Sequence, residues 1–76
     1  EAVREAMDRG VAALRERRLD DAVEACRSAL ALAPDLAEAH SLAGLALAHT
    51  GRVDEALPQL GRADELEPAQ PGYRFN

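Results

Sequence analysis

The sequence predicts an all-α fold built from antiparallel helix pairs, and three observations carry this prediction. Seventeen of the 76 residues are Ala and eleven are Leu, two residues that favour helices strongly. Isoleucine is absent and only two residues are aromatic, whereas strands draw on β-branched and aromatic side chains. Small and apolar residues recur at an offset of 34 positions, and Gly and Pro residues separate the apolar segments.

The first predicted helix pair lies within residues 3–36. Its first helix is expected to run from about residue 2 to residue 16, and its second helix to begin at Asp20. We expect Asp20 to cap that second helix, because a side-chain carboxylate can accept a hydrogen bond from an unpaired backbone N–H of the first turn. Pro34 has no N–H to donate, so the helix is expected to end before it.

The second predicted helix pair lies within residues 37–70. One helix is expected over about residues 36–50 and the other over about residues 54–67, with Asp54 as the cap of the latter. Gly51 falls between the two helices and is expected to adopt the left-handed conformation that ends many helices.

One residue conflicts with this second pair. Pro58 falls four residues after the expected cap, where its missing N–H removes the first hydrogen bond within the helix. At that position the cost is expected to be smaller than the loss of about 3 kcal/mol in a true helix interior. The prediction therefore keeps the helix.

The two pairs match each other at an offset of 34 residues. Gly10 and Gly44 share one position of this repeat, and a Gly in mid-helix costs about 1 kcal/mol relative to Ala. We therefore expect both glycines to lie where a neighbouring helix crosses. The other matching pairs are Arg18 and Arg52, Asp20 and Asp54, Ala22 and Ala56, Ala29 and Ala63, Leu32 and Leu66, and Pro34 and Pro68.

The residues at the repeated positions follow the pattern of a known family. In the first repeat they are Gly10, Leu19, Ala22, Ala29, Leu30, Leu32 and Pro34. In the second they are Ala37 to His40, Gly44, Leu47, Gly51, Ala56, Leu60, Ala63 and Pro68. Together they resemble the tetratricopeptide repeat. The resemblance implies a short right-handed α-solenoid that forms one domain over residues 1–76, with residues 71–76 as a tail or a truncated third repeat.

Four positions depart from the family's pattern. Arg9 and Arg17 stand where the family usually has Leu and Gly, so the first helix of repeat one is expected to be more exposed. Ala6 and His40 replace the customary large aromatic residue. These replacements predict a thinner core and a lower stability.

The resemblance also implies a binding surface, because the first helix of each repeat lines the concave face of such arrays. The groove positions that it assigns are Arg4, Met7, Val11, Leu14 and Arg15 in repeat one, and Glu38, Ser41, Leu45, Ala48 and His49 in repeat two. Three of them, Met7, Val11 and Leu14, form an apolar stripe by their helical spacing alone. Such a stripe is typical of a core as well as of a groove.

The expected partner is an extended peptide or an amphipathic helix with apolar anchors, and Arg4 or Arg15 would meet an acidic group on it. The family subtype that clamps the C-terminal carboxylates of chaperones uses Lys and Asn at the groove positions. This chain has Met, Val, Ser and Leu there, so the charged donors of such a clamp are missing.

Several other functions are not expected from this sequence. A net charge of −5, with the Arg residues offset by neighbouring acids, gives no basic stripe for a nucleic acid. The apolar runs are too short to span a membrane. Cys26 is the only cysteine, so no internal disulfide can form. His40 and His49 point to opposite sides of one helix, so they cannot hold one metal ion together. No glycine-rich phosphate loop, zinc motif or nucleophile elbow is visible, so neither cofactor, metal nor catalysis is expected.

The leading interpretation is a non-catalytic protein–protein interaction scaffold of the cytoplasm. One alternative is an accessory domain that presents substrates to a larger enzyme. Another is a self-association module that uses the uncovered end of the second repeat, since stacked arrays usually need three or more repeats to bury their faces. Because the chain begins with Glu1 rather than Met, we expect it to be a piece of a longer protein.

Overall fold

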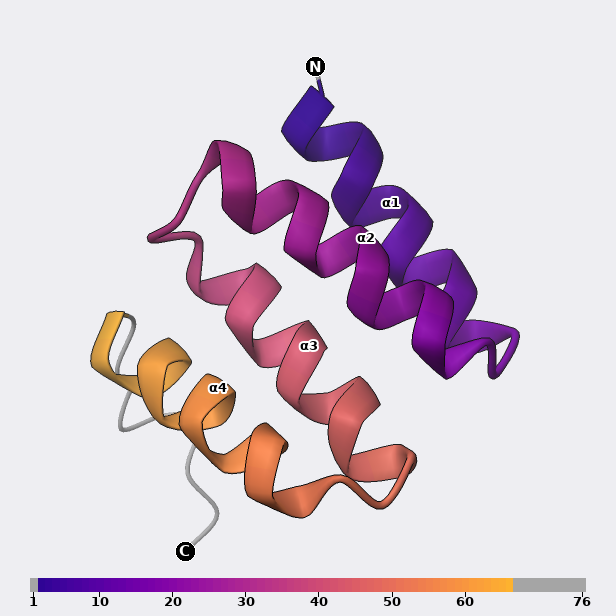
Figure 1. Cartoon of the computed structure of the whole chain (residues 1–76). Helices are drawn as coiled ribbons and strands as arrows, with labels where there is room; N and C mark the ends of the chain where they lie inside the picture. The colour runs from indigo at the N-terminus through magenta and orange to yellow at the C-terminus, as the bar shows by residue number, and fades with distance from the viewer. Residues whose placement is uncertain (1, 67–76) are drawn as a thin grey trace, which may run out of the picture.

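The computed structural model describes residues 2–66, and these residues form four helices. They are α1 (Ala2–Arg15), α2 (Leu19–Leu32), α3 (Ala37–His49) and α4 (Val53–Leu66). The helices lie side by side in chain order, and each runs antiparallel to the next (Figure 1). The predicted all-α fold of antiparallel helix pairs is thereby confirmed, with helix ends that differ from the predicted ones by about one residue.

The packing joins the two helix pairs through α3. Within each repeat the two helices pack together, α1 with α2 and α3 with α4. The α3 helix also packs against α2 and touches α1. It therefore has neighbours on several sides, and its buried residues are Ala37, Ala39, Ala43, Gly44, Ala46 and Leu47.

The turn after α3 is a left-handed helix ending of the predicted kind. The backbone N–H of Gly51 donates to the carbonyl of Ala48 at 3.0 Å, and that of Arg52 donates to the carbonyl of Leu47 at 2.9 Å. This pair of bonds satisfies carbonyls that the helix leaves unpaired, and it requires a residue with positive φ. Gly51 supplies it with a φ of 87°, which confirms the prediction.

The same ending closes α1 without a glycine. The N–H of Arg17 donates to the carbonyl of Leu14 at 3.0 Å, and that of Arg18 donates to the carbonyl of Ala13 at 2.8 Å. Arg17, which is 34 residues before Gly51, adopts a φ of 63°. This is the left-handed conformation, in which any residue with a Cβ atom has a strained backbone.

The predicted helix caps at Asp20 and Asp54 are wrong. Each residue is the second residue of its helix, inside the first turn. At α2 the cap position is Arg18, whose side chain makes no cap bond. The Asp20 carboxylate instead accepts a hydrogen bond from Nη2 of Arg52 at 2.9 Å. Both acids still lie where the positive end of the helix dipole favours them.

Pro58 also lies deeper in its helix than predicted. Because α4 begins at Val53, Pro58 is its sixth residue, in the second turn. At that position an ordinary residue would donate its N–H to the carbonyl of Asp54. The bond that is lost is therefore a regular helical one, and its cost is closer to that of a helix interior.

The core consists of small side chains that let the helices approach closely. Among residues 2–66, Cys26 is the largest fully buried side chain. A Cβ atom added at Gly44 would lie 2.6 Å from Cγ of Leu60, and one added at Gly10 would lie 3.0 Å from Cδ2 of Leu42. Both glycines thus lie at helix crossings, as predicted. The two clusters of buried residues are Ala13, Ala22, Val23, Ala46, Leu47 and Ala56, and Ala6, Met7, Ala29 and Ala39.

Candidate functional site

The predicted partner residues lie on the first helices of the two repeats, α1 and α3, which touch each other. We call the surface that these residues form the α1–α3 face. Leu45 is its most accessible large apolar side chain, with 45% of its surface exposed. Val11 and Leu14 are half-buried. The remaining exposed members are Arg4, Arg15, Glu38, Ser41, Ala48 and His49.

Met7 does not lie on the accessible part of this face. Only 3% of its surface is exposed, and it packs in a core cluster with Ala6, Ala29 and Ala39. Its spacing to Val11 places it on the predicted stripe of α1, yet this end of the stripe is covered. The spacing of a stripe gives its direction on one helix, and the packing of the neighbouring helices, here α2 and α3, decides how much of it stays open.

Charged side chains lie at both ends of the α1–α3 face. Arg15 and His49 occupy the last residues of α1 and α3, and Arg4 and Glu38 lie in the first turns of the same helices. Within residues 2–66, neither Arg4 nor Arg15 forms an ion pair. Their guanidinium groups are therefore free to meet an acidic group of a partner.

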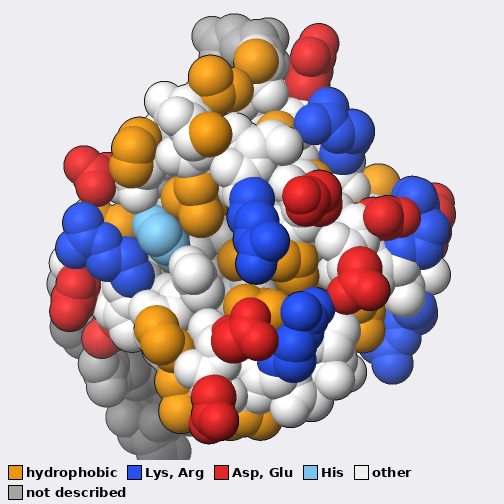
Figure 2. Space-filling view, viewed as in Figure 1, with side chains coloured by type: hydrophobic (Ala, Val, Ile, Leu, Met, Phe, Trp, Pro, Cys, Tyr) orange, Lys and Arg blue, Asp and Glu red, His pale blue; other side chains and the backbone are white. Residues whose placement is uncertain are grey.

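Charges of both signs are mixed over the surface. Figure 2 shows acidic side chains beside arginines on the visible face, with apolar side chains exposed between them. Two of the ion pairs join the repeats, Asp20 with Arg52 at 2.9 Å and Asp35 with Arg62 at 3.3 Å. Exposed pairs of this kind contribute at most about 1 kcal/mol each, so they orient the repeats more than they stabilise them.

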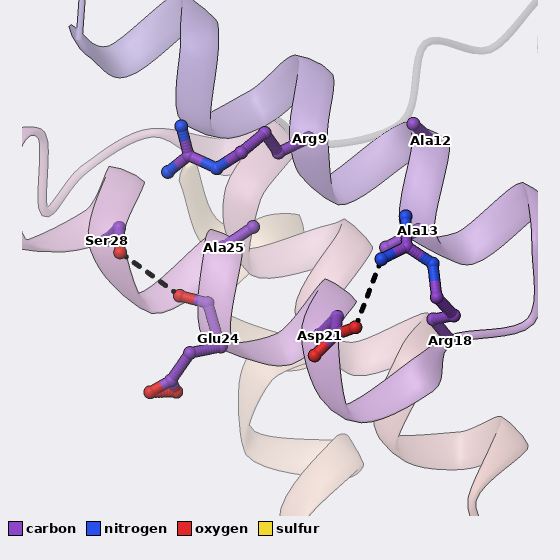
Figure 3. A pocket seen from close by; sticks show the side chains of 8 residues that line it. All are labelled: Arg9, Ala12, Ala13, Arg18, Asp21, Glu24, Ala25 and Ser28. Atoms are coloured by element: carbon purple, nitrogen blue, oxygen red, sulfur yellow. Dashed lines mark hydrogen bonds and ion pairs between the residues drawn. The ribbon is translucent and has the colours of Figure 1, made fainter.

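A groove of about 360 Å³ lies between α1 and α2 (Figure 3). In this view Arg9 extends from α1 along the opening, on the side of Ser28. Arg18 lies at the other side and is bound by Asp21 at 3.2 Å. The floor is formed by alanines, and the full lining is Arg9, Ala12, Ala13, Arg18, Asp21, Glu24, Ala25 and Ser28.

A related groove of about 350 Å³ lies in the second repeat. Five of its residues are the 34-residue counterparts of the first groove's lining: Ala43, Leu47, Glu55, Pro58 and Gln59. Its additional wall comes from Val23, Arg27 and Leu30 of α2, and Asp54 completes it. The two grooves are thus one feature of the repeat, and neither includes any predicted partner residue. The 34-residue offset, applied to the lining of the first groove, gives the five shared positions of the second.

His40 ties α3 to its surroundings. Its Nδ1 lies 2.8 Å from Oε1 of Gln59 on α4, and its Nε2 lies 2.9 Å from the backbone oxygen of Pro34. These two contacts hold α3 to α4 and to the loop before α3. His40 therefore has a packing role at a helix seam, and His49 is exposed at the end of α3.

The thiol of Cys26, the strongest nucleophile of the chain, is buried in the core. Cys26 has no exposed surface, and burial raises the pKa of its thiol from 9.0 to about 11. Since the thiolate is the reactive form, the thiol is inert near neutral pH. Between Ala2 and Leu66 no three His, Cys, Asp or Glu side chains are grouped so as to hold a metal ion. Over the same residues, no helix has the length and apolar character that a membrane crossing requires.

The comparison with known families identifies the repeat. A sequence model of the tetratricopeptide repeat matches residues 7–72, which is most of the chain. Comparisons with curated proteins and with solved structures gave no match. The matched region includes all of α2, α3 and α4 and the larger part of α1, so the family pattern and the paired helices describe the same residues. Repeats of this kind generally mediate protein–protein interaction and are typically non-catalytic. The chain belongs to the tetratricopeptide repeat family.

Proposed function

We propose that this chain is a non-catalytic scaffold that binds an extended peptide or an amphipathic helix of another protein through the α1–α3 face. The single observation that carries the proposal is the exposure of Leu45, an apolar side chain of α3 that is 45% accessible, while Val11 and Leu14 on the neighbouring first helix are half-buried. In this proposal the α1–α3 face takes the role that the concave side has in tetratricopeptide arrays.

The apolar middle and the charged ends of the face have separate roles in this proposal. Val11, Leu14 and Leu45 offer the anchor positions that an apolar partner residue would cover, and burying a Leu side chain is worth about 1.5–3 kcal/mol. Arg15 at one end has no internal ion-pair partner within residues 2–66 and attracts an acidic group. Binding of this kind needs no cofactor or metal.

The proposal is tested with peptides selected from a random display library on the wild-type chain. We expect Leu45→Asp to weaken the selected peptides at least about tenfold, because a charge replaces the central anchor. Arg15→Glu is expected to weaken those peptides that carry acidic residues and to spare the others. Affinities are measured by isothermal titration calorimetry.

The matched control is Leu32→Asp, because Leu32 is 57% exposed and lies at the end of α2, outside the α1–α3 face. Peptide affinity is expected to be unchanged in this variant. Selected peptides that bind the helical Leu45→Asp variant as tightly as the wild type would rule out the α1–α3 face as their binding surface.

A further inference from the structure

One side of α4 is exposed, although the equivalent side of α2 is covered by α3. Val23 of α2 is 5% exposed, because it packs in one core cluster with Ala46 and Leu47 of α3. Its counterpart 34 residues later, Leu57 of α4, is 61% exposed. Since α2 and α4 occupy equivalent places in the two repeats, the contact between α2 and α3 indicates which surface fits this side of α4. That surface is the first helix of a repeat.

The groove between α1 and α2 presents such a surface at the other end of the stack (Figures 1 and 3). Ala12 and Ala13 of α1 line this groove, and they are the counterparts of Ala46 and Leu47. In repeat two, the related groove is walled on one side by residues of α2, among them Val23. Within residues 2–66 no helix takes that place beside the groove of repeat one.

The sizes of the side chains at these positions are complementary. Inside the chain, Val23 of α2 shares a cluster with Leu47 of α3. If α4 of one copy packs on α1 of the next copy as α2 packs on α3, Leu57 meets Ala13 instead. The larger side chain on α4 is then matched by a smaller one on α1, so the summed volume is conserved, which is the kind of exchange that packing tolerates best.

The charges at a second pair of positions are complementary as well. Leu30 of α2 and Ala43 of α3 line one groove in repeat two. Their counterparts are Asp64 of α4 and Arg9 of α1, which are both exposed. Neither forms an ion pair within residues 2–66. The same packing would therefore bring an acid and a base together where the internal contact has two apolar side chains.

Two acids of α1, Glu5 and Asp8, border this contact. Glu5 takes the place of Ala39, which shares a core cluster with Met7. The counterpart of Met7 on α3 is Ser41, whose hydroxyl can donate to the Glu5 carboxylate of the next copy. Asp8 takes the place of a half-buried leucine of α3, so its carboxylate keeps contact with water. Of the α1–α3 face, the contact includes only Ser41.

We propose that the exposed side of α4 binds the α1–α2 groove of a second copy of this chain, so that copies stack head to tail as the two repeats do. Leu57 of one copy rests on Ala12 and Ala13 of the next, and Asp64 pairs with Arg9. Because the two surfaces differ and lie on helices that do not pack against each other, each copy keeps a free end and the array stays open.

Growth of the array is measured as the molar mass of the 76-residue chain by sedimentation equilibrium, from micromolar to millimolar concentration. The mass of the wild type is expected to rise past that of two chains. Leu57→Asp is expected to weaken association roughly tenfold or more, because it places a charge on the alanine floor. The control is Leu32→Asp, which alters a leucine of similar exposure (57%) that lines neither groove, and it is expected to associate like the wild type. A wild type that stays monomeric, or that stops at two chains, would overturn the proposal.

An exchange of charges tests the pairing of Arg9 with Asp64. Arg9→Asp and Asp64→Arg are each expected to weaken association roughly fivefold, since each brings like charges together. The double variant is expected to restore association. Because α1 and α4 do not pack against each other within one chain, such a recovery comes from contact between copies. A double variant no stronger than either single variant would count against the proposal.

Two variants with opposite ends blocked distinguish this arrangement from a symmetric dimer. Ala12→Glu, at an exposed position, puts a charge in the groove and leaves α4 intact, whereas Leu57→Asp leaves the groove intact. Each variant alone is expected to remain monomeric at concentrations where the wild type associates. Their equimolar mixture is expected to reach the mass of two chains and no more, because one intact contact remains for each pair. A mixture that stays monomeric contradicts head-to-tail stacking. Circular dichroism verifies that each variant is folded.

Discussion

At the residue scale, two different residues, Arg17 and Gly51, adopt the same left-handed conformation in the turns after α1 and α3. Both turns need a positive φ to complete the same pair of backbone hydrogen bonds. Gly51 meets this need at no steric cost, whereas Arg17 holds a φ of 63° with a full side chain. The turn of the first repeat is therefore strained and that of the second is not. Substituting Arg17 by Gly is expected to remove the strain.

Arg17→Gly is expected to stabilise the chain by about 0.5–1 kcal/mol. Relief of a left-handed conformation is worth about 1–2 kcal/mol, and the greater freedom of Gly in the unfolded chain offsets part of it. Urea unfolding followed by circular dichroism measures the difference. Gly51→Ala is the mirrored control and is expected to lose about 1 kcal/mol, because a Cβ at Gly51 meets open space but a strained backbone. Equal stability of Arg17→Gly and the wild type would show that the turn is unstrained.

The buried thiol of Cys26 predicts a loss of stability at alkaline pH. The folded state holds its pKa at about 11, against 9.0 in the unfolded chain. As pH rises, the thiol therefore loses its proton in the unfolded state before it does so in the folded state. The contribution of Cys26 to the free energy of unfolding is fully present below pH 9 and falls as pH rises towards 11. Cys26→Ala is expected to flatten this part of the profile. Urea unfolding across this pH range measures it, and identical profiles for the two proteins would contradict the prediction.

At the element scale, α3 contributes most to the packing because it contacts all three other helices. Leu47 of α3 is 3% exposed and lies in the core cluster that joins both repeats. The surrounding buried side chains are mostly alanines, which leave little freedom to fill a vacated space. A large side chain in this helix is therefore difficult to replace.

Leu47→Ala is expected to destabilise the chain by about 2–4 kcal/mol, through lost burial and a residual cavity. For a domain this small, such a loss is expected to leave much of the population unfolded. The helical signal at 222 nm, followed on heating, measures the change. In the control Leu32→Ala, a leucine that is already 57% exposed is shortened, and the expected change is within about 0.5 kcal/mol. Two variants of equal stability would refute the role of Leu47.

Pro58 destabilises α4 because it lies in the second turn of the helix rather than at its start. Pro58→Ala is expected to stabilise the chain by about 2 kcal/mol, since it restores a backbone donor at a modest cost in unfolded-chain freedom. Chemical unfolding measures the gain, with Pro34→Ala in the loop before α3 as a control of little effect. A decrease in stability would mean that the ring of Pro58 makes contacts that outweigh the lost bond.

The helices themselves could be predicted from the sequence, and several side-chain roles could not. Alanine and leucine content, the 34-residue offset and breakers such as Gly51 depend on local backbone preferences, which a sequence displays directly. The role of Asp20 depends on Arg52, which is 32 residues away, so a local pattern predicted a cap instead. In the same way, Met7 is buried against Ala29 of α2 and Ala39 of α3, although its spacing on α1 is equally typical of a groove.

At the scale of the whole molecule, two helix pairs stack through small side chains and leave surfaces of different character. In α1, Glu5, Asp8 and Arg9 are exposed, whereas α4 exposes the apolar side chains Leu57 and Leu60. The α1–α3 face combines an apolar middle with charged ends. These differences arise from substitutions at equivalent repeat positions, such as Arg9 against Ala43 and Cys26 against Leu60.

The α1–α3 face is tested most directly as a binding surface by NMR, with amide chemical shifts recorded while a selected peptide is added to the chain. If the peptide binds the α1–α3 face, the perturbed residues are expected to cluster on α1 and α3, around Val11, Leu14, Leu45 and Ala48. His49 and Arg15 are expected to shift with peptides that carry an acidic group. Perturbations confined to α2 and α4, with these α1 and α3 residues unmoved, would contradict it.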